Sequence, residues 1–146
     1  MTPAAAVGRV LGVDLGARRI GLALSDPTRT VASPLEVLPR GRAHEDDHRA
    51  ILAVACEHGV RTIVVGLPLS LSGAIGAAAR AALDEVDELR AAAGDDIEVE
   101  SFDERLTTVT AERSLREARM RRDARRRVVD KVAAAVMLQT YLESSA

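Results

Sequence analysis

Two short apolar runs near the start of the chain, Val10–Leu15 and Ile20–Ser25, are separated by only four residues. A gap this short predicts a hairpin of two antiparallel strands. The first run contains a carboxylate, Asp14, just before the turn signal at Gly16. Burying a carboxylate is costly unless a partner or a bound ion compensates, so Asp14 is the first candidate functional residue. The alternative is a structural aspartate that accepts hydrogen bonds from the turn.

The remaining pattern predicts three more strands and four helices. Pro34 indicates that the third strand lies near an edge of the sheet. The predicted strands are 31–38, 62–65 and 97–102, and the predicted helices are 45–58, 77–93, 107–119 and 128–142, with 120–127 left as loop or helix. Short connections make the first three strands antiparallel, whereas strands that follow helices are parallel. We therefore expect one α/β domain over residues 1–146, a mixed five-stranded sheet with helices on both faces, and flexible tails at 1–8 and 144–146.

Composition narrows the function classes. The single cysteine, Cys56, excludes an intrachain disulfide, and its apolar surroundings predict a core position. No apolar run approaches the ~18 residues of a membrane helix, so a soluble, cytoplasmic protein without a membrane partner is expected. Two aromatic residues, Phe102 and Tyr141, argue against recognition of nucleic acid by base stacking.

Basic residues are concentrated late in the chain, although the net charge is −2. Ten of the 20 lysines and arginines lie between Arg105 and Lys131. Such a run is either a solvated helix face or a surface for a polyanion. Because carboxylates flank the run at both ends, we favour contact with phosphates.

Two of those flanking carboxylates could join Asp14. Asp103 and Glu104 directly follow the fifth predicted strand, and because neighbours on an extended backbone point opposite ways, only one should face Asp14. Asp130 begins the last predicted helix. The alternative for Asp103 or Glu104 is a surface ion pair with Arg105. The alternative for Asp130 is a carboxylate that stabilises the helix N-terminus through the helix dipole. Three carboxylates on separate elements are what a two-metal phosphodiesterase site requires.

Four motifs in this order resemble the YqgF family, also called RuvX. They span Val13–Gly21, Val65–Pro68, Asp103–Thr108 and Asp130–Gln139, and the resemblance extends over nearly the whole chain. It implies a ribonuclease H-like fold related to the RuvC resolvases and cleavage of structured nucleic acid that depends on Mg²⁺ or Mn²⁺, with two ions expected. It assigns catalysis and metal binding to Asp14, Glu104 and Asp130, with Asp103 as the less favoured choice beside Glu104.

The resemblance implies a hydrolase of phosphodiester bonds that matures the 5′ end of pre-16S rRNA within a ribosomal precursor particle. One alternative is a Holliday junction resolvase acting on branched DNA, and another is a non-catalytic nucleic-acid-binding factor in ribosome assembly or transcription. The sequence leaves open RNA or DNA, endonuclease or exonuclease, and monomer or homodimer. The candidate phosphate-contacting residues are Arg18, Arg19, Arg105, Arg121, Arg122, Arg125, Arg126, Arg127 and Lys131.

Two other motifs point to different chemistry and are rejected. His44–His48 matches the His-Glu-x-x-His pattern of zinc peptidases, but Val54 stands where the extended motif has its third histidine. The hairpin around Asp14 also resembles the phosphate hairpin of actin-like ATPases. Those enzymes enclose a nucleotide between two such lobes, and 146 residues supply only one.

Overall fold

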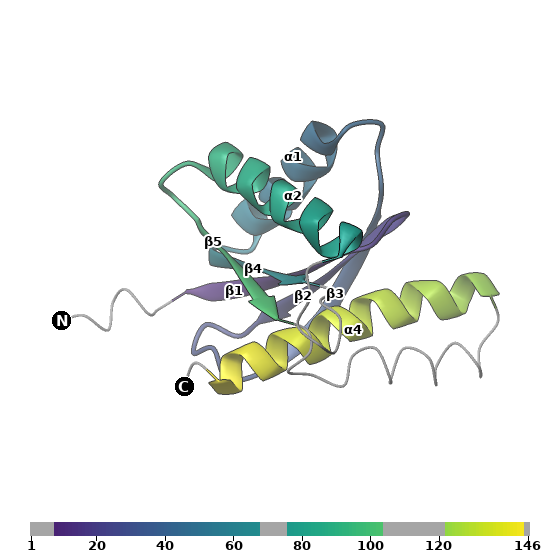
Figure 1. Cartoon of the computed structure of the whole chain (residues 1–146). Helices are drawn as coiled ribbons and strands as arrows, with labels where there is room; N and C mark the ends of the chain where they lie inside the picture. The colour runs from purple at the N-terminus through teal and green to yellow at the C-terminus, as the bar shows by residue number, and fades with distance from the viewer. Residues whose placement is uncertain (1–7, 68–75, 104–121, 145–146) are drawn as a thin grey trace.

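The computed structural model describes residues 8–67, 76–103 and 122–144, with side chains included except at positions 122–129. The elements, in chain order, are β1 Arg9–Leu15, β2 Arg19–Ser25, β3 Ala32–Pro39, α1 His44–Glu57, β4 Val60–Leu67, α2 Ala77–Ala93, β5 Glu98–Asp103 and α4 Arg122–Ser144 (Figure 1). No helix within these ranges is long and apolar enough to cross a membrane.

The five strands form one sheet in the order β3-β2-β1-β4-β5. The hairpin connections make β1, β2 and β3 antiparallel neighbours. Strands β4 and β5 each follow a helix, and they run parallel to β1 and to each other. A helix between two strands allows the chain to return to the starting edge of the sheet, whereas a tight turn cannot. The predicted mixed sheet is therefore confirmed, with β1 at its centre.

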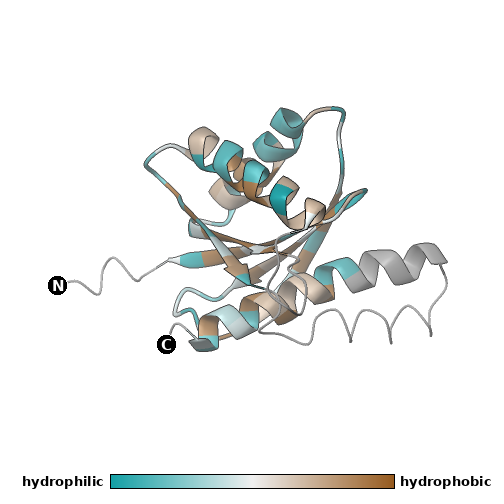
Figure 2. Cartoon of the chain, viewed as in Figure 1, coloured by the Kyte–Doolittle hydropathy of each residue, from teal (hydrophilic) through white to brown (hydrophobic). Residues whose placement is uncertain are grey.

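Alternating side chains of β1 belong to two separate hydrophobic cores, one on each face of the sheet. Leu11 and Val13 pack with α1 and α2 on one face, whereas Val10 packs with α4 on the other. The helices accordingly cover opposite faces of the sheet (Figure 1), and the strands between them are largely hydrophobic (Figure 2). A Cβ atom on Gly12 would lie 2.9 Å from the Leu138 Cβ, so glycine at this position permits the close approach of α4.

The last helix extends beyond the predicted range 128–142 at both ends. Helix α4 begins at Arg122, so the stretch left open as loop or helix is helical from that residue, because arginine is a good helix former and a run of arginines does not end a helix. It also includes Ser144, which had been expected in a tail. At the other end, the Gly8 carbonyl accepts a hydrogen bond from Arg29. The rest of both tails and the predicted helix 107–119 lie outside the described residues.

Cys56 lies at the surface, so the prediction that it occupies a core position is wrong. In α1 the buried side chains include Ile51, Val54 and Ala55. Cys56 follows Ala55 by one position and is rotated by about 100° around the helix axis, which turns it away from the core. The apolar run around it therefore did not indicate its own burial.

Candidate active site

Asp14 lies near the end of the central strand and is only 7% exposed. Successive side chains of a strand point to opposite faces of the sheet. Val13 faces α1 and α2, whereas Val10 and Gly12, which are an even number of positions from Asp14, face α4. The carboxylate therefore belongs to the face of the sheet that α4 covers. A carboxylate at this depth requires charged or hydrogen-bonding groups around it.

Asp130 is brought to the same place by a close backbone contact. Gly21 of β2 pairs with Asp14 in the antiparallel ladder. A Cβ atom on Gly21 would lie 2.2 Å from the Asp130 carbonyl oxygen, so α4 rests directly on the backbone of β2 at this point. Asp14 and Asp130, which are 116 positions apart in the sequence, thus converge on one strand pair beneath α4.

The position of Asp130 within α4 excludes the alternative that this carboxylate stabilises the N-terminus of the helix. Because the helix begins at Arg122, Asp130 lies about two turns from the first residue. The favourable effect of the helix dipole on an acid is confined to the first turn. The interpretation as a helix N-terminal carboxylate is therefore wrong.

Asp130 instead forms an ion pair with Arg19. The Arg19 Nε donates to the Asp130 Oδ2 at 2.9 Å, and the two side chains are 26% and 19% exposed. Arg19 shares its side of β2 with Gly21 and Ala23, of which Ala23 packs in the α4 core. Arg19, a candidate phosphate-contacting residue, thus already has an anionic partner within the protein.

Asp103 is the last residue of β5, which lies two strands from β1 in the sheet. Its side chain is on the opposite face of the sheet from that of Asp14. Phe102 packs against the α4 core, and Glu100 accepts a hydrogen bond from Tyr141 of α4. Val99, by contrast, belongs to the core beneath α1 and α2. Asp103 alternates with Phe102 and shares the parity of Val99, so the strand places Asp103 on the side away from Asp14. Glu104 lies outside the described residues.

The candidate phosphate-contacting residues are described by the structure to different extents. Arg18 is exposed in the β1–β2 turn, and its carbonyl accepts the backbone N–H of Arg40. Lys131 is half-buried next to Asp130. Arg122, Arg125, Arg126 and Arg127 lie in the first turns of α4, with their side chains undescribed. Arg105 and Arg121 lie outside the described residues.

A groove of about 430 Å³ opens beside the Arg19–Asp130 pair. Arg19 and Lys131 supply its cationic groups. Its other wall comes from β3, through Leu35, Glu36, Val37 and Pro39. The sequence did not predict this groove, because it depends on how α4 crosses the β2–β3 edge. We call it the Arg19–Lys131 groove.

The His-Glu-x-x-His segment has a structural role on the opposite face. His48 is buried, and its Nε2 lies 2.9 Å from the Glu85 Oε2. Arg40 donates to both Glu85 oxygens, at 2.8 and 2.9 Å, and to the Asp47 Oδ2 at 3.0 Å. Burial raises the pKa of Glu85, but the hydrogen bonds from Arg40 and His48 outweigh it, and the pKa lies below its usual value.

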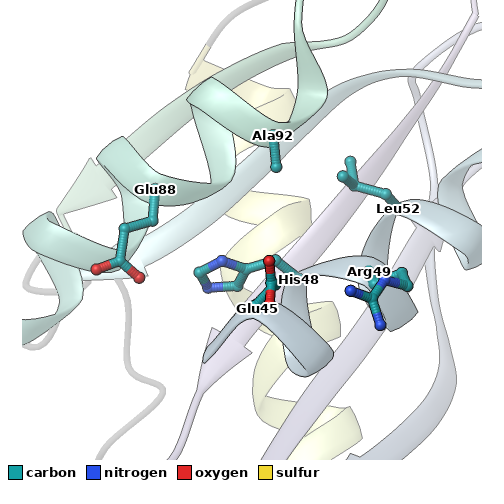
Figure 3. A pocket seen from close by; sticks show the side chains of 6 residues that line it. All are labelled: Glu45, His48, Arg49, Leu52, Glu88 and Ala92. Atoms are coloured by element: carbon teal, nitrogen blue, oxygen red, sulfur yellow. The ribbon is translucent and has the colours of Figure 1, made fainter. Parts of the chain in front are cut away.

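This network does not resemble a metal centre. Both Glu85 oxygens are engaged by a guanidinium, and within the described ranges no three His, Cys, Asp or Glu side chains are grouped so as to hold an ion. The adjoining pocket of about 520 Å³ lies between α1 and α2, with Glu45, His48, Arg49 and Leu52 facing Glu88 and Ala92 (Figure 3). It is separated from Asp14 by the sheet.

Comparison with solved structures defines the class of fold. Thermus thermophilus RuvC superposes with a TM-score of 0.55 at 16% sequence identity, and the match covers 94% of this chain and 96% of RuvC. RuvC in complex with a Holliday junction substrate gives the same score and covers 93% of this chain. The protein therefore has the predicted ribonuclease H-like fold, in which the sheet carries a carboxylate on its central strand.

The chain belongs to the RuvX family, described as Holliday junction resolvase, whose sequence profile matches residues 8–144. A relative from Roseiflexus sp. (strain RS-1), named “Putative pre-16S rRNA nuclease”, is 45% identical over 140 residues, which cover 94% of this chain and 95% of the relative. A relative of the same name from Mycobacterium ulcerans is 43% identical and covers 98% of this chain and 83% of its own length. The predicted class, a nuclease that hydrolyses phosphodiester bonds and hence has nucleic acid as its partner, is confirmed.

Proposed function

We propose that this protein is a metal-dependent nuclease that acts on structured RNA and matures the 5′ end of pre-16S rRNA. The observation that carries the proposal is the convergence of Asp14 and Asp130 on the face of the sheet beneath α4. The names of the relatives, which cover nearly their whole length, support the choice of substrate. A cytoplasmic location would accompany this role and stays a prediction.

The proposed metal ligands are Asp14, Asp130 and Glu104, and Mg²⁺ or Mn²⁺ is the expected ion, with two ions bound. The described donors fit such ions, since both are carboxylates, Asp14 is almost fully buried, and the Asp130 backbone packs on Gly21, the ladder partner of Asp14. Asp103 has the parity of the other face, which supports Glu104 as the third ligand. When bound, the ions supply an activated water and neutralise charge on the departing oxygen.

The protein's own residues would orient the reacting groups. Asp14, on the rigid central strand, fixes the depth at which a scissile phosphate can enter. Asp130 approaches from α4, so its position depends on the packing of that helix against β2. Arg18 and Lys131, with the arginines of the first turns of α4, would contact flanking phosphates, which guanidinium groups bind through two parallel hydrogen bonds.

Cleavage of a precursor RNA tests the proposal. The purified chain with Mg²⁺ or Mn²⁺ should process an RNA that contains the 16S 5′ precursor junction, and Asp14→Asn should abolish the activity. Asp95→Asn, a substitution at an exposed carboxylate in the turn after α2, is the matched control and should retain activity. Equal activity of wild type and Asp14→Asn would contradict the proposal, and RNA binding without cleavage would indicate a non-catalytic factor.

The family description gives one alternative substrate, the four-way DNA junction. Symmetric cleavage of a junction requires two active sites related by a twofold axis. A homodimer that cuts junction DNA but leaves the precursor RNA intact would favour this alternative, and a monomer that cuts the RNA would exclude it. Mapping the cleaved ends distinguishes an endonuclease from an exonuclease.

A further inference from the structure

The ion pair between Arg19 and Asp130 lies at the proposed metal site. Arg19 belongs to the strand next to Asp14 and has its side chain on the α4 face, so its guanidinium approaches Asp130 from beneath the helix. The contact uses one carboxylate oxygen, Oδ2, at 2.9 Å. Both side chains are about three-quarters or more buried, so water screens this pair less than a surface pair.

A guanidinium and a divalent cation on the same carboxylate repel each other, even where each contacts a different oxygen. Bringing a second positive charge to Asp130 places it beside the Arg19 guanidinium, and like charges at short range oppose each other strongly where water is partly excluded. Loading the site with metal therefore favours a shift of Arg19 away from Asp130. A shifted guanidinium needs another anion, because leaving it without one would lose the interaction it now makes.

The Arg19–Lys131 groove provides the place for that second anion. Arg19 already lines it, together with Lys131 and the wall from β3. Pro39 of this wall is the direct cross-strand neighbour of Arg19, so the groove begins beside the Arg19 backbone, and a different rotamer of this flexible side chain would place the guanidinium in it. Two cations at one side of a groove beside a nuclease centre suit a phosphodiester backbone.

We propose that Arg19 is a positioning residue that exchanges partners. It holds Asp130 in the metal-free protein, gives up Asp130 when a divalent cation binds, and then contacts a backbone phosphate of the nucleic-acid strand in the Arg19–Lys131 groove. The inference rests on the proposed function, since it requires Asp130 to be a metal ligand. Because coupled binding is reciprocal, metal should strengthen strand binding and the strand should strengthen metal binding.

Mn²⁺ titration of the full chain by calorimetry tests the first half of the exchange. Arg19→Gln should bind Mn²⁺ about fivefold more tightly than wild type, since a partly buried pair is worth roughly 1 kcal/mol. Arg19→Lys keeps the charge and should lie between the two. Arg42→Gln is the matched control: Arg42 is exposed, makes no ion pair with any described residue, and should leave Mn²⁺ affinity unchanged. Circular dichroism confirms that each variant is folded.

Binding of a labelled 2′-O-methyl RNA strand, which resists cleavage, tests the second half. Wild type should bind this strand more tightly with Mn²⁺ than without it, by about the same factor as above. Arg19→Gln should lose that enhancement, whereas Arg42→Gln should keep it. An enhancement of equal size in Arg19→Gln would overturn the contact with phosphate.

Asp14→Asn separates failure of this inference from failure of the proposed function. If wild type and Asp14→Asn bind Mn²⁺ equally, or neither binds it, the metal site is wrong and the inference falls with it. If Asp14→Asn loses Mn²⁺ but Arg19→Gln binds the ion no more tightly than wild type, only the exchange of partners is overturned. Tighter Mn²⁺ binding together with the lost enhancement supports the proposal.

Discussion

Gly21 and Asp130 make a backbone contact that leaves no room for a side chain: a Cβ atom on Gly21 would lie 2.2 Å from the Asp130 carbonyl oxygen. This contact sets the distance between α4 and the hairpin that carries Asp14. The position of one proposed metal ligand therefore depends on the absence of a side chain on the strand beneath it.

Gly21→Ala should push α4 away from the sheet. Overpacking of this kind costs about 1–3 kcal/mol of unfolding free energy, which denaturant titration measures. Nuclease activity should fall further than stability accounts for, since Asp130 moves away from Asp14. Gly76→Ala is the control, because a Cβ there meets nothing within 4 Å. Full activity in a folded Gly21→Ala protein would contradict the role given to this contact.

Arg40→Ala should destabilise the protein through the opposite face. The substitution leaves the buried carboxylates of Glu85 and Asp47 without their guanidinium, and a broken buried pair costs roughly 3 kcal/mol. Arg49→Ala disrupts an exposed pair with Asp46 and should cost less than ~1 kcal/mol in the same unfolding experiment. The Arg40 Nε also donates to the Gly16 carbonyl at 2.9 Å, in the turn that follows Asp14, so the folded Arg40→Ala protein should lose part of its activity per molecule, whereas Arg49→Ala should not.

Asp26 should contribute to a loss of stability in acid. A side-chain hydrogen bond from Thr28 and backbone N–H groups of Val31 and Thr30 lower the pKa of Asp26 below its ordinary value of 3.8. A lowered folded-state pKa gives stability that is present above the unfolded-state pKa and is lost as the pH falls through the folded-state pKa. Thr28→Val should raise the pKa of Asp26, as measured by NMR titration of its side-chain carboxyl. An unchanged titration would show that Thr28 is not the main cause.

Glu104→Gln and Asp103→Asn should differ, although the residues are neighbours. Loss of a proposed metal ligand should reduce cleavage by more than about a hundredfold, since outer-shell partners alone cost 10–100-fold. Asp103 has the parity of the other face of the sheet, so Asp103→Asn should retain most of the activity and of the Mn²⁺ affinity. The reverse pattern would show that the strand alternation does not continue past Asp103.

The hairpin and the directions of the strands could be predicted from the sequence because they follow from local spacing. Four residues between two apolar runs permit one geometry, and helices between later strands fix their direction. Asp14 was identifiable for the same reason, as a charge inside an apolar run. Asp130 was a candidate because it lies at the end of the basic run, and the family motifs supported it, although its place two turns inside α4 was not foreseen.

The interactions of Arg19 and Arg40 could not be predicted, because they join distant parts of the chain. Arg19 and Asp130 are 111 positions apart, and Arg40 and Glu85 are 45 apart. A single sequence gives no signal for such pairs. Arg19 begins β2 and Arg40 directly follows β3, and an arginine at either position is equally compatible with exposure to solvent. Only the packing of α4 and α2 reveals their partners.

The most direct test of the metal-dependent nuclease is a crystal of this protein soaked in Mn²⁺, examined by anomalous scattering. We expect anomalous density bounded by Asp14, Glu104 and Asp130, with the Arg19 guanidinium turned from Asp130 towards the Arg19–Lys131 groove. Density at His44 and His48, with none beside Asp14, would contradict it.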